Sequence, residues 1–217
     1  MESGGRNKEF RSIWLLLAGF GVSAAVVLML CFSFAAGLPD TVGRPLTAEE
    51  AKEVTERNSS LTAYIYLSPN ADFPREKEIR KITIHHMAGD FSLEELGETF
   101  SRRDRRASSG RVALYVEESN RAWTSGSRDN DNQAVTVEVA NDEMGGDWHV
   151  GDNTYAALIE LCTDICLRNG IEELQYTGYA EGNLTIHKMF TGDTECPGPY
   201  LESKMEEIAR EVNSNLR

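Results

Sequence analysis

The sequence predicts an α/β domain with a mixed, mainly parallel central sheet and helices on both faces, preceded by an N-terminal transmembrane helix. Three observations lead to this fold class. Segments rich in β-branched residues alternate with segments of helical periodicity, as in strands that are joined by crossover helices. The length of 217 residues suits one domain with a single core. An uncharged apolar run near the N-terminus forms a separate module.

This N-terminal module begins with a basic segment, residues 1–12, which is predicted to be cytoplasmic. Residues 13–37 follow as an apolar run; as a helix rising about 1.5 Å per residue, it exceeds the roughly 30 Å of bilayer hydrocarbon. A cleaved signal segment is the alternative, because Ser33-Phe34-Ala35 resembles a small-x-small cleavage site. The domain is therefore expected outside the cell membrane and anchored to it, or secreted if the segment is cleaved.

A linker with one short helix is predicted for residues 38–60. Thr47 and Glu50 have the spacing of a capping box, which predicts a helix over residues 47–58. The remaining chain, residues 61–217, is predicted to form the folded domain.

The elements of this domain are predicted in chain order. Strands are expected where β-branched and aromatic residues gather: 61–67, 81–86, 111–117, 134–140 and 184–187. Helices are expected where apolar residues recur at helical spacing near capping signals: 92–103, 153–169 and 199–213. Gly170 ends the second helix, and Pro199 lies in the first turn of the last. Cys162 and Cys166 share one helix face, so we interpret them as small core hydrophobes.

Charge and cysteine content narrow the function classes. The chain has 35 acidic against 22 basic residues and a net charge of -13, which argues against a phosphate-binding surface and against nucleic acid as a partner. Its four cysteines are too few and too scattered for a disulfide scaffold in a chain that can bury a real core. The presence of Cys196, at least, therefore needs an explanation other than a disulfide scaffold.

Three of the four histidines lie in two short segments that suggest a metal site. Strand residues alternate in direction, so His85 points with Thr83 while His86 points to the opposite face. His187, after a second strand, and Cys196, on the following loop, add an imidazole and a thiolate, the ligands that zinc prefers. A zinc site with three protein ligands and a structural role for these side chains both remain open at this point.

Glu138 is the one charge within the apolar strand over residues 134–140. Burying an isolated carboxylate costs on the order of several kcal/mol unless the group is paired or has a task. A carboxylate near a metal site could take a proton from water and return it to a leaving nitrogen. The alternative is a glutamate at the strand edge that faces water.

Four ordered motifs together resemble the zinc-dependent N-acetylmuramoyl-L-alanine amidases of the peptidoglycan-recognition-protein superfamily. The motifs are T-I-H-H-M-A-G at 83–89, N-R-A-W at 120–123, residues 132–141, and residues 187–198 with their C-P-G. The resemblance covers about residues 79–212. It implies the amidase fold and a Zn²⁺ cofactor held by His85, His187 and Cys196.

The resemblance also implies roles for further residues. Glu138 would be the general base, and Thr194 would help to polarise the scissile carbonyl. Trp123 and Asn132 would bind substrate, although Trp123 as a packing aromatic remains an equal alternative. The implied reaction is hydrolysis of the amide between N-acetylmuramic acid and L-alanine in peptidoglycan. Peptidoglycan is the expected partner, the membrane is expected through the N-terminal helix, and a monomer is expected.

One departure from the family pattern lies before Gly110. Relatives usually carry a further strand and an Asp-Gly turn there, whereas here Ala107-Ser108-Ser109 runs directly into Gly110. This difference predicts a vacancy beside the strand of His85. Either residues 111–117 fill it, or the domain folds poorly and lacks activity. A non-catalytic peptidoglycan-binding module with a degenerate site is therefore the first alternative function, and a membrane-surface interaction protein without metal is a second.

Overall fold

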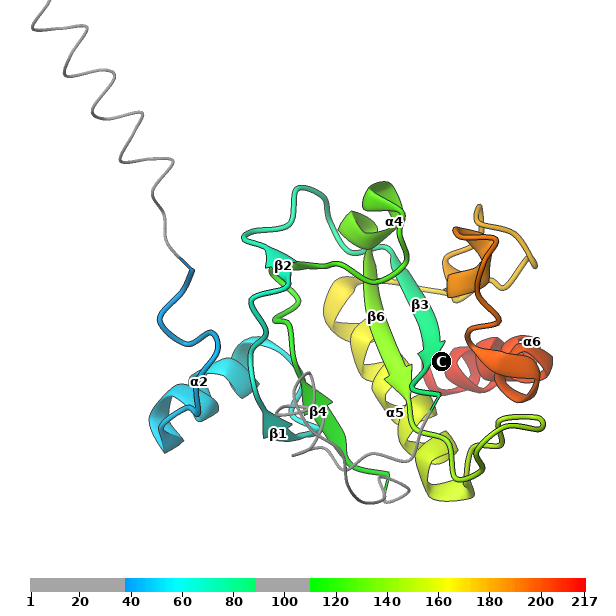
Figure 1. Cartoon of the computed structure of the whole chain (residues 1–217), viewed down its shortest axis with the longest axis horizontal. Coiled ribbons are helices and arrows are strands. Elements are labelled where there is room, and N and C mark those ends of the chain that lie inside the picture. The colour runs from blue at the N-terminus through cyan, green and yellow to red at the C-terminus, as the bar shows by residue number, and fades with distance from the viewer. Residues whose placement is uncertain (1–37, 89–109) are drawn as a thin grey trace, which may run out of the picture. The chain divides into compact units, whose positions relative to one another are not determined.

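The computed structural model describes residues 38–88 and 110–217, and residues 40–217 belong to one compact unit (Figure 1). Its helices and strands are, in chain order, α2 (Ala48–Arg57), β1 (Thr62–Ile65), β2 (Ala71–Asp72), β3 (Lys81–His86), β4 (Val112–Leu114), β5 (Arg121–Ala122), α4 (Arg128–Gln133), β6 (Ala134–Val139), α5 (Asp152–Asn169), β7 (Leu184–Ile186), the 3-10 turn η1 (His187–Met189) and α6 (Gly198–Asn215).

The central sheet has three strands in the order β6-β3-β7, and both pairings are parallel. β1 and β4 form a second parallel pair, and β2 and β5 form an antiparallel pair. Within the described residues the central sheet is therefore wholly parallel, whereas a mixed, mainly parallel central sheet was predicted. The antiparallel pair belongs to a separate ladder.

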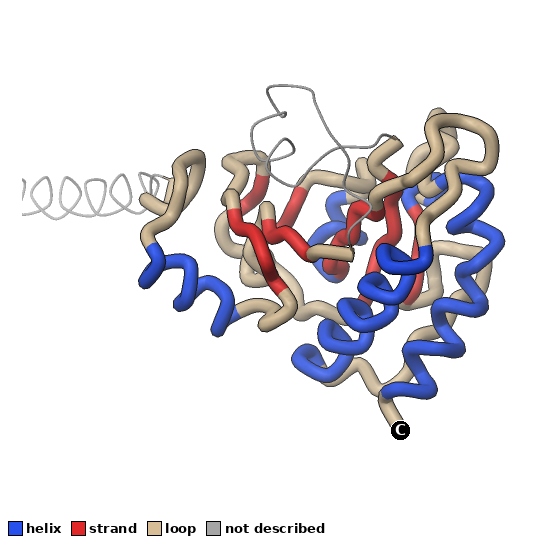
Figure 2. The backbone as a smooth tube through the Cα atoms, turned by 90° about the horizontal axis from the view of Figure 1, so that it is seen from below, coloured by secondary structure: helices blue, strands red, loops and turns tan. Residues whose placement is uncertain are grey.

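The two faces of the central sheet differ in chemistry. Ile82 and Ile84 of β3 pair in register with apolar residues of β6 and β7, and these side chains form one buried face. α5 and α6 lie side by side against this face (Figures 1 and 2). Leu201 and Met205 of α6 are fully buried there, and each such side chain contributes about 1.5–3 kcal/mol of burial free energy. The opposite face carries polar side chains and holds the candidate site.

Helices were predicted on both faces of the sheet, and α5 and α6 cover the apolar face. On the polar face, the described residues place only the short helix α4, whose Asn130 donates a hydrogen bond to Thr83 Oγ1 at 2.9 Å. The helix predicted over residues 92–103 lies outside the described residues.

Local sequence signals predicted several element boundaries well. α2 has the complete capping box of Thr47 and Glu50. α5 ends at Gly170, which adopts the left-handed conformation with φ of 66°, and α6 begins at Gly198 with a proline in its first turn. Cys162 and Cys166 are fully buried in the core as free thiols, as predicted. β1 and β4 are shorter than predicted.

The vacancy predicted beside β3 does not exist, so that prediction was wrong. Both edges of β3 are occupied, by β6 on one side and β7 on the other. β4 pairs with β1 and does not enter the central sheet. Within the described part of the chain it is the outer edge of β6 that lacks a strand partner. Neighbouring strands of a parallel sheet come from segments that are far apart in the sequence. The sequence alone therefore could not show which strand edge the shortened segment before Gly110 affects.

The segment predicted as a linker is folded against the rest of the unit. Arg57, at the end of α2, pairs with Glu117 at 3.3 Å, and Asn58 Oδ1 accepts the Glu118 backbone N–H at 2.8 Å. The domain boundaries themselves stay predictions.

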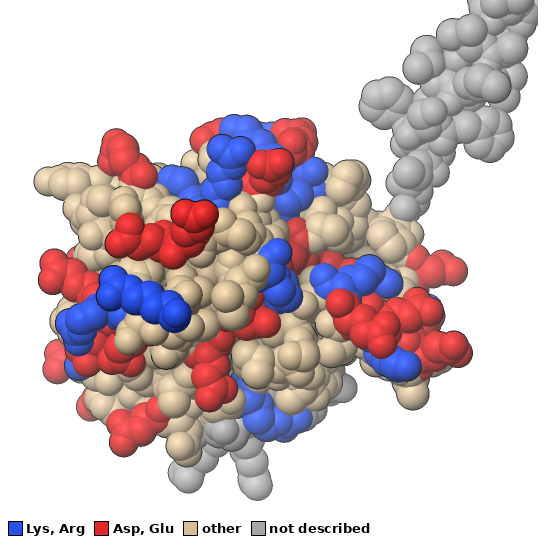
Figure 3. Space-filling model, turned by 180° about the vertical axis from the view of Figure 1, so that it is seen from behind, with Lys and Arg blue, Asp and Glu red and all other residues tan. Residues whose placement is uncertain are grey.

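No helix among residues 38–88 and 110–217 is long and apolar enough to cross a bilayer. The predicted span, residues 13–37, lies outside these residues. Figure 3 shows acidic and basic side chains interspersed over the face that lies behind the view of Figure 1.

Candidate functional site

Three potential metal ligands from distant segments meet on the polar side of the sheet. His85 lies near the end of β3, His187 directly follows β7, and Cys196 lies on the loop before α6. One ligand atom from each lies within 4.8 Å of the other two, and the two imidazole rings have centroids 4.5 Å apart. Tetrahedral zinc bonds of about 2.0–2.3 Å would hold the ligand atoms roughly 3.3–3.8 Å apart, so a small closure would complete the site.

The backbone explains why these side chains converge. In parallel β3 and β7, Thr83 pairs with Thr185, so His85 and His187, two residues further along, leave the sheet at the same edge and on the same face. The Cys196 thiol approaches from the loop and accepts the His86 backbone N–H at 3.4 Å. The loop is tied to the histidine segment by a hydrogen bond from Lys188 N to Cys196 O of 3.1 Å.

His86 has a different position from His85. Its ring packs edge-on against Trp148, with centroids 5.1 Å apart. A Cβ at Gly198 would lie 3.3 Å from this ring and 3.1 Å from the Trp148 Cβ. Glycine therefore lets the His86 and Trp148 side chains press against the turn that follows Cys196.

The donor set fits zinc chemically. His85 is 2% exposed, and its Nε2 is buried without a hydrogen-bond partner. Burial, followed by the neighbouring His187 and His86, lowers the pKa of His85 to about 3, so it is the neutral imidazole that metals bind. Burial raises the pKa of the Cys196 thiol to about 11. A dication would favour the thiolate at neutral pH, because ligation deprotonates a thiol.

We expect acid to destabilise the metal-free protein through His85. Its folded-state pKa of about 3 lies below the value of about 6.5 in the unfolded chain. As pH falls below about 6.5, the unfolded state therefore binds the additional proton, and stability declines by up to about 1.4 kcal/mol per pH unit. Urea unfolding with chelator at pH 7.5 and pH 5 should show a steeper loss for wild type than for His85→Gln; equal slopes would contradict the assignment.

Glu138 lies beside the three candidate ligands and is not part of that group. In register with His85 on the neighbouring strand, it places Oε1 3.7 Å from His85 Nδ1. Its side chain is 48% exposed, yet desolvation raises the pKa of the carboxyl group to about 7. It lines a cavity of about 310 Å³ that Met87, Trp123 and Thr136 also line. This is a suitable place for a general base: next to the metal ligands and open to a substrate.

Thr194 is oriented by the cysteine loop. Its Oγ1 accepts the backbone N–H of Cys196 at 3.2 Å. Because the oxygen is the acceptor in this bond, the hydroxyl proton remains available for donation to another group.

The two predicted substrate-binding residues have different surroundings. Trp123 is 56% exposed and lines the 310 Å³ cavity. Asn132 is 2% exposed; its Oδ1 accepts the backbone N–H of Glu76 at 3.0 Å, and its Nδ2 lies 3.4 Å from the Glu76 carboxylate. Its substrate-binding role stays a prediction, and it would require Asn132 to exchange these hydrogen bonds for a ligand.

Sequence reasoning overlooked the polar layer beneath the metal ligands. The Thr83 and Thr185 hydroxyls lie 3.0 Å apart on adjacent strands, and Asn130 donates to Thr83. Strand alternation already placed Thr83 on the face of His85, and the same reasoning applied to Thr185 and His187 could have found the second hydroxyl. By joining β3, β7 and α4, the layer holds the two histidines in register.

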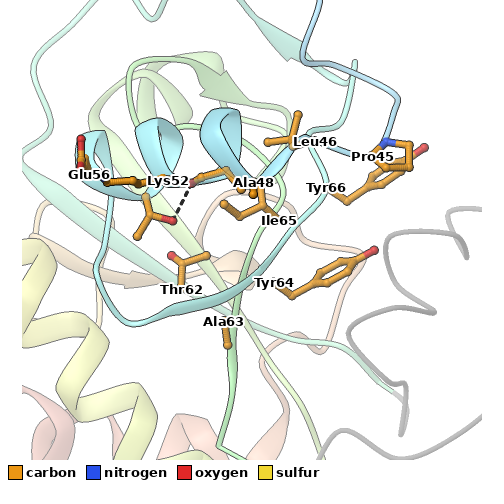
Figure 4. A pocket seen from close by; sticks show the side chains of 12 residues that line it. Pro45, Leu46, Ala48, Lys52, Glu56, Thr62, Ala63, Tyr64, Ile65 and Tyr66 are labelled. Atoms are coloured by element: carbon orange, nitrogen blue, oxygen red, sulfur yellow. Dashed lines mark hydrogen bonds and ion pairs between the residues drawn. The ribbon is translucent and has the colours of Figure 1, made fainter.

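A second hollow, of about 560 Å³, lies between α2 and β1 (Figure 4). Its lining includes Lys52, Thr55, Tyr64 and Tyr66, with no histidine or cysteine. The chemically competent side chains therefore gather at the edge of the central sheet and not in this hollow.

The chain is similar in fold to several solved structures and matches one family model. "Structure of PlyL" has 16% identity and a TM-score of 0.50, covering 69% of this chain and 95% of that one. At that identity, the likeness shows the fold. "N-acetylmuramoyl-L-alanine amidase LysC from Clostridium intestinale" scores 0.44 at 16% identity, covering 60% and 84%. Drosophila peptidoglycan recognition protein SD scores 0.40 at 17% identity, covering 62% and 88%.

No curated protein sequence matches the chain. The model of the family described as N-acetylmuramoyl-L-alanine amidase matches residues 75–199, which is more than half of the chain and contains every candidate site residue above. The chain therefore belongs to the N-acetylmuramoyl-L-alanine amidase family.

Proposed function

We propose that this protein is a zinc-dependent hydrolase that cleaves the amide between N-acetylmuramic acid and L-alanine in peptidoglycan. The observation that carries the proposal is the meeting of His85, His187 and Cys196, with the Glu138 carboxylate 3.7 Å from His85. Family membership and similar structures whose titles name this amidase activity support it.

The candidate site residues would have three different roles in this hydrolysis. His85, His187 and Cys196 would hold zinc, which when bound supplies a Lewis acid for the scissile carbonyl and for water. Glu138 accepts a proton from the attacking water and returns it to the leaving nitrogen, a role typically worth about 10²- to 10⁴-fold in rate. The Thr194 hydroxyl donates to the oxygen on which negative charge develops.

We expect kcat/KM to rise with pH over the range in which the Glu138 carboxyl group loses its proton. A general base must be deprotonated to accept a proton, and desolvation raises the pKa of Glu138 to about 7 in the metal-free protein. A bound dication favours the carboxylate, so this range should lie at pH 7 or below. The measurement is kcat/KM for wall hydrolysis between pH 4 and 8; a rate that falls with rising pH over this range contradicts the role.

Metal analysis combined with a release assay tests the proposed function. The purified protein should contain about one zinc per chain and should release new amine ends from purified cell wall. Zinc without new amine ends would contradict the enzyme and leave the alternative, a non-catalytic peptidoglycan-binding module. The unpaired outer edge of β6 within the described residues is the observation that favours this alternative.

We also propose that residues 13–37 anchor the amidase domain to the cell membrane and place it outside the cytoplasm. The proposal is supported by the length of the uncharged apolar run and by the basic residues before it. Cell fractionation with protease protection distinguishes an anchored protein from a secreted, cleaved one.

A further inference from the structure

The Trp123 side chain is fixed by a hydrogen bond from its indole nitrogen, its one polar side-chain atom. The indole Nε1 donates a hydrogen bond of 3.0 Å to Asp72 Oδ1, while 56% of the residue remains exposed. The same side chain lines the cavity that contains Glu138. An exposed aromatic ring is thus fixed in orientation at the edge of the candidate active site.

Asp72 is itself fixed by two arginines. Its Oδ2 accepts from Arg121 Nε at 2.8 Å and from Arg128 at 3.1 Å, which leaves Oδ1 for the indole. β2 pairs antiparallel with β5, and this register places Asp72 opposite Arg121. The charge-assisted bonds make the carboxylate a rigid acceptor, because ionised partners give the stronger hydrogen bonds. Asp72 stands before residues 75–199, the stretch that the family model matches.

This arrangement limits what Trp123 can recognise. Indole has one hydrogen-bond donor and no acceptor, and Asp72 already uses the donor. The exposed ring therefore offers flat apolar surface and cannot donate to the carboxylates or amide carbonyls of a stem peptide. A flat apolar surface suits the C–H face of a saccharide ring. Aromatic contact area of this kind, combined with a few polar groups, is typical of ligand pockets.

We propose that Asp72 is a positioning residue that presents Trp123 as a stacking platform for the glycan part of the substrate. This inference rests on the proposed function and goes beyond it by assigning the saccharide, and not the stem peptide, to this end of the cavity. Fixing the ring before binding removes the cost of ordering it in the complex. Losing the Asp72 contact should weaken glycan binding about 3- to 10-fold, the equivalent of ordering one side chain.

The test is calorimetric binding to the full-length, zinc-loaded chain in a Glu138→Ala background, in which hydrolysis is expected to be slowed about 10²- to 10⁴-fold. Three ligands are compared: the N-acetylglucosamine–N-acetylmuramic acid disaccharide with its stem peptide, the disaccharide alone, and the stem peptide alone. Asp72→Ala should weaken both disaccharide ligands about 3- to 10-fold and leave the stem peptide unchanged. Glu78→Gln is the control for removing a carboxylate charge and should leave all three affinities unchanged, because Glu78 is exposed and pairs with Arg80.

Trp123→Phe keeps an aromatic ring and leaves the Asp72–Arg121 ion pair intact, so it provides the second variant if Asp72→Ala folds poorly. It should weaken the disaccharide ligands, and adding Asp72→Ala to it should cost little more, because the two residues act through one hydrogen bond. Independent, additive losses would overturn the positioning role.

The outcomes separate the two proposals. A Glu138→Ala protein that binds none of the three ligands overturns the proposed function together with this inference. If the intact muramyl peptide binds and Asp72→Ala binds it equally well, the inference alone is overturned. Weaker binding of the stem peptide alone would overturn the assignment of the glycan to Trp123.

Discussion

Replacement of Glu138 with alanine is expected to reduce the turnover of wall hydrolysis by about 10²- to 10⁴-fold while zinc content stays at the wild-type level. The carboxylate is 3.7 Å from His85 Nδ1 and is not among the three converging ligand atoms. Its loss removes the group that moves protons and leaves the metal-binding atoms in place. The measurement is kcat for release of amine ends, with zinc determined on the same preparation.

Glu160→Gln is the control for removing a glutamate charge. Glu160 is exposed on α5, so its neutralisation should leave both kcat and zinc content unchanged. If Glu138→Ala hydrolyses cell wall at the wild-type rate, Glu138 is not the base. If it loses zinc as well, the carboxylate belongs to the ligand set.

Replacement of Cys196 with alanine is expected to lower zinc affinity by more than about 100-fold, and activity should fall with it. Loss of a residue that only supports a ligand typically costs 10- to 100-fold, and Cys196 supplies one of three ligand atoms within 4.8 Å of one another. Competition against a chromogenic chelator measures the affinity directly. Zinc should also cease to raise the Tm of the variant, because stabilisation by a ligand depends on its affinity for the folded state.

Cys166→Ala is the matched control, since Cys166 is a buried free thiol of the core. That variant should lose some stability to the cavity left behind and should retain zinc. A Cys196→Ala protein that kept full zinc content would exclude the proposed ligand set.

Elements whose causes are local could be predicted from the amino-acid sequence alone. A capping box starts α2, Gly170 ends α5, and the alternation of β3 separates His85 from His86. These features depend on residues within one or two turns of each other, so their patterns can be recognised without the fold. Sequence chemistry also suggested His85, His187 and Cys196 as ligands, and family resemblance singled out Glu138 as the base.

How distant segments meet could not be predicted in this way and depends on the packing of the whole fold. In the structure, β6 and β7 lie on either side of β3, and β4 pairs with β1. The Asn132 side chain accepts a hydrogen bond from the Glu76 backbone. The Trp123 indole donates a hydrogen bond to Asp72, and no local sequence pattern predicts this contact. Strand partners and buried hydrogen bonds depend on which surfaces the chain removes from water together, and that choice is made by the whole core and not by neighbouring residues.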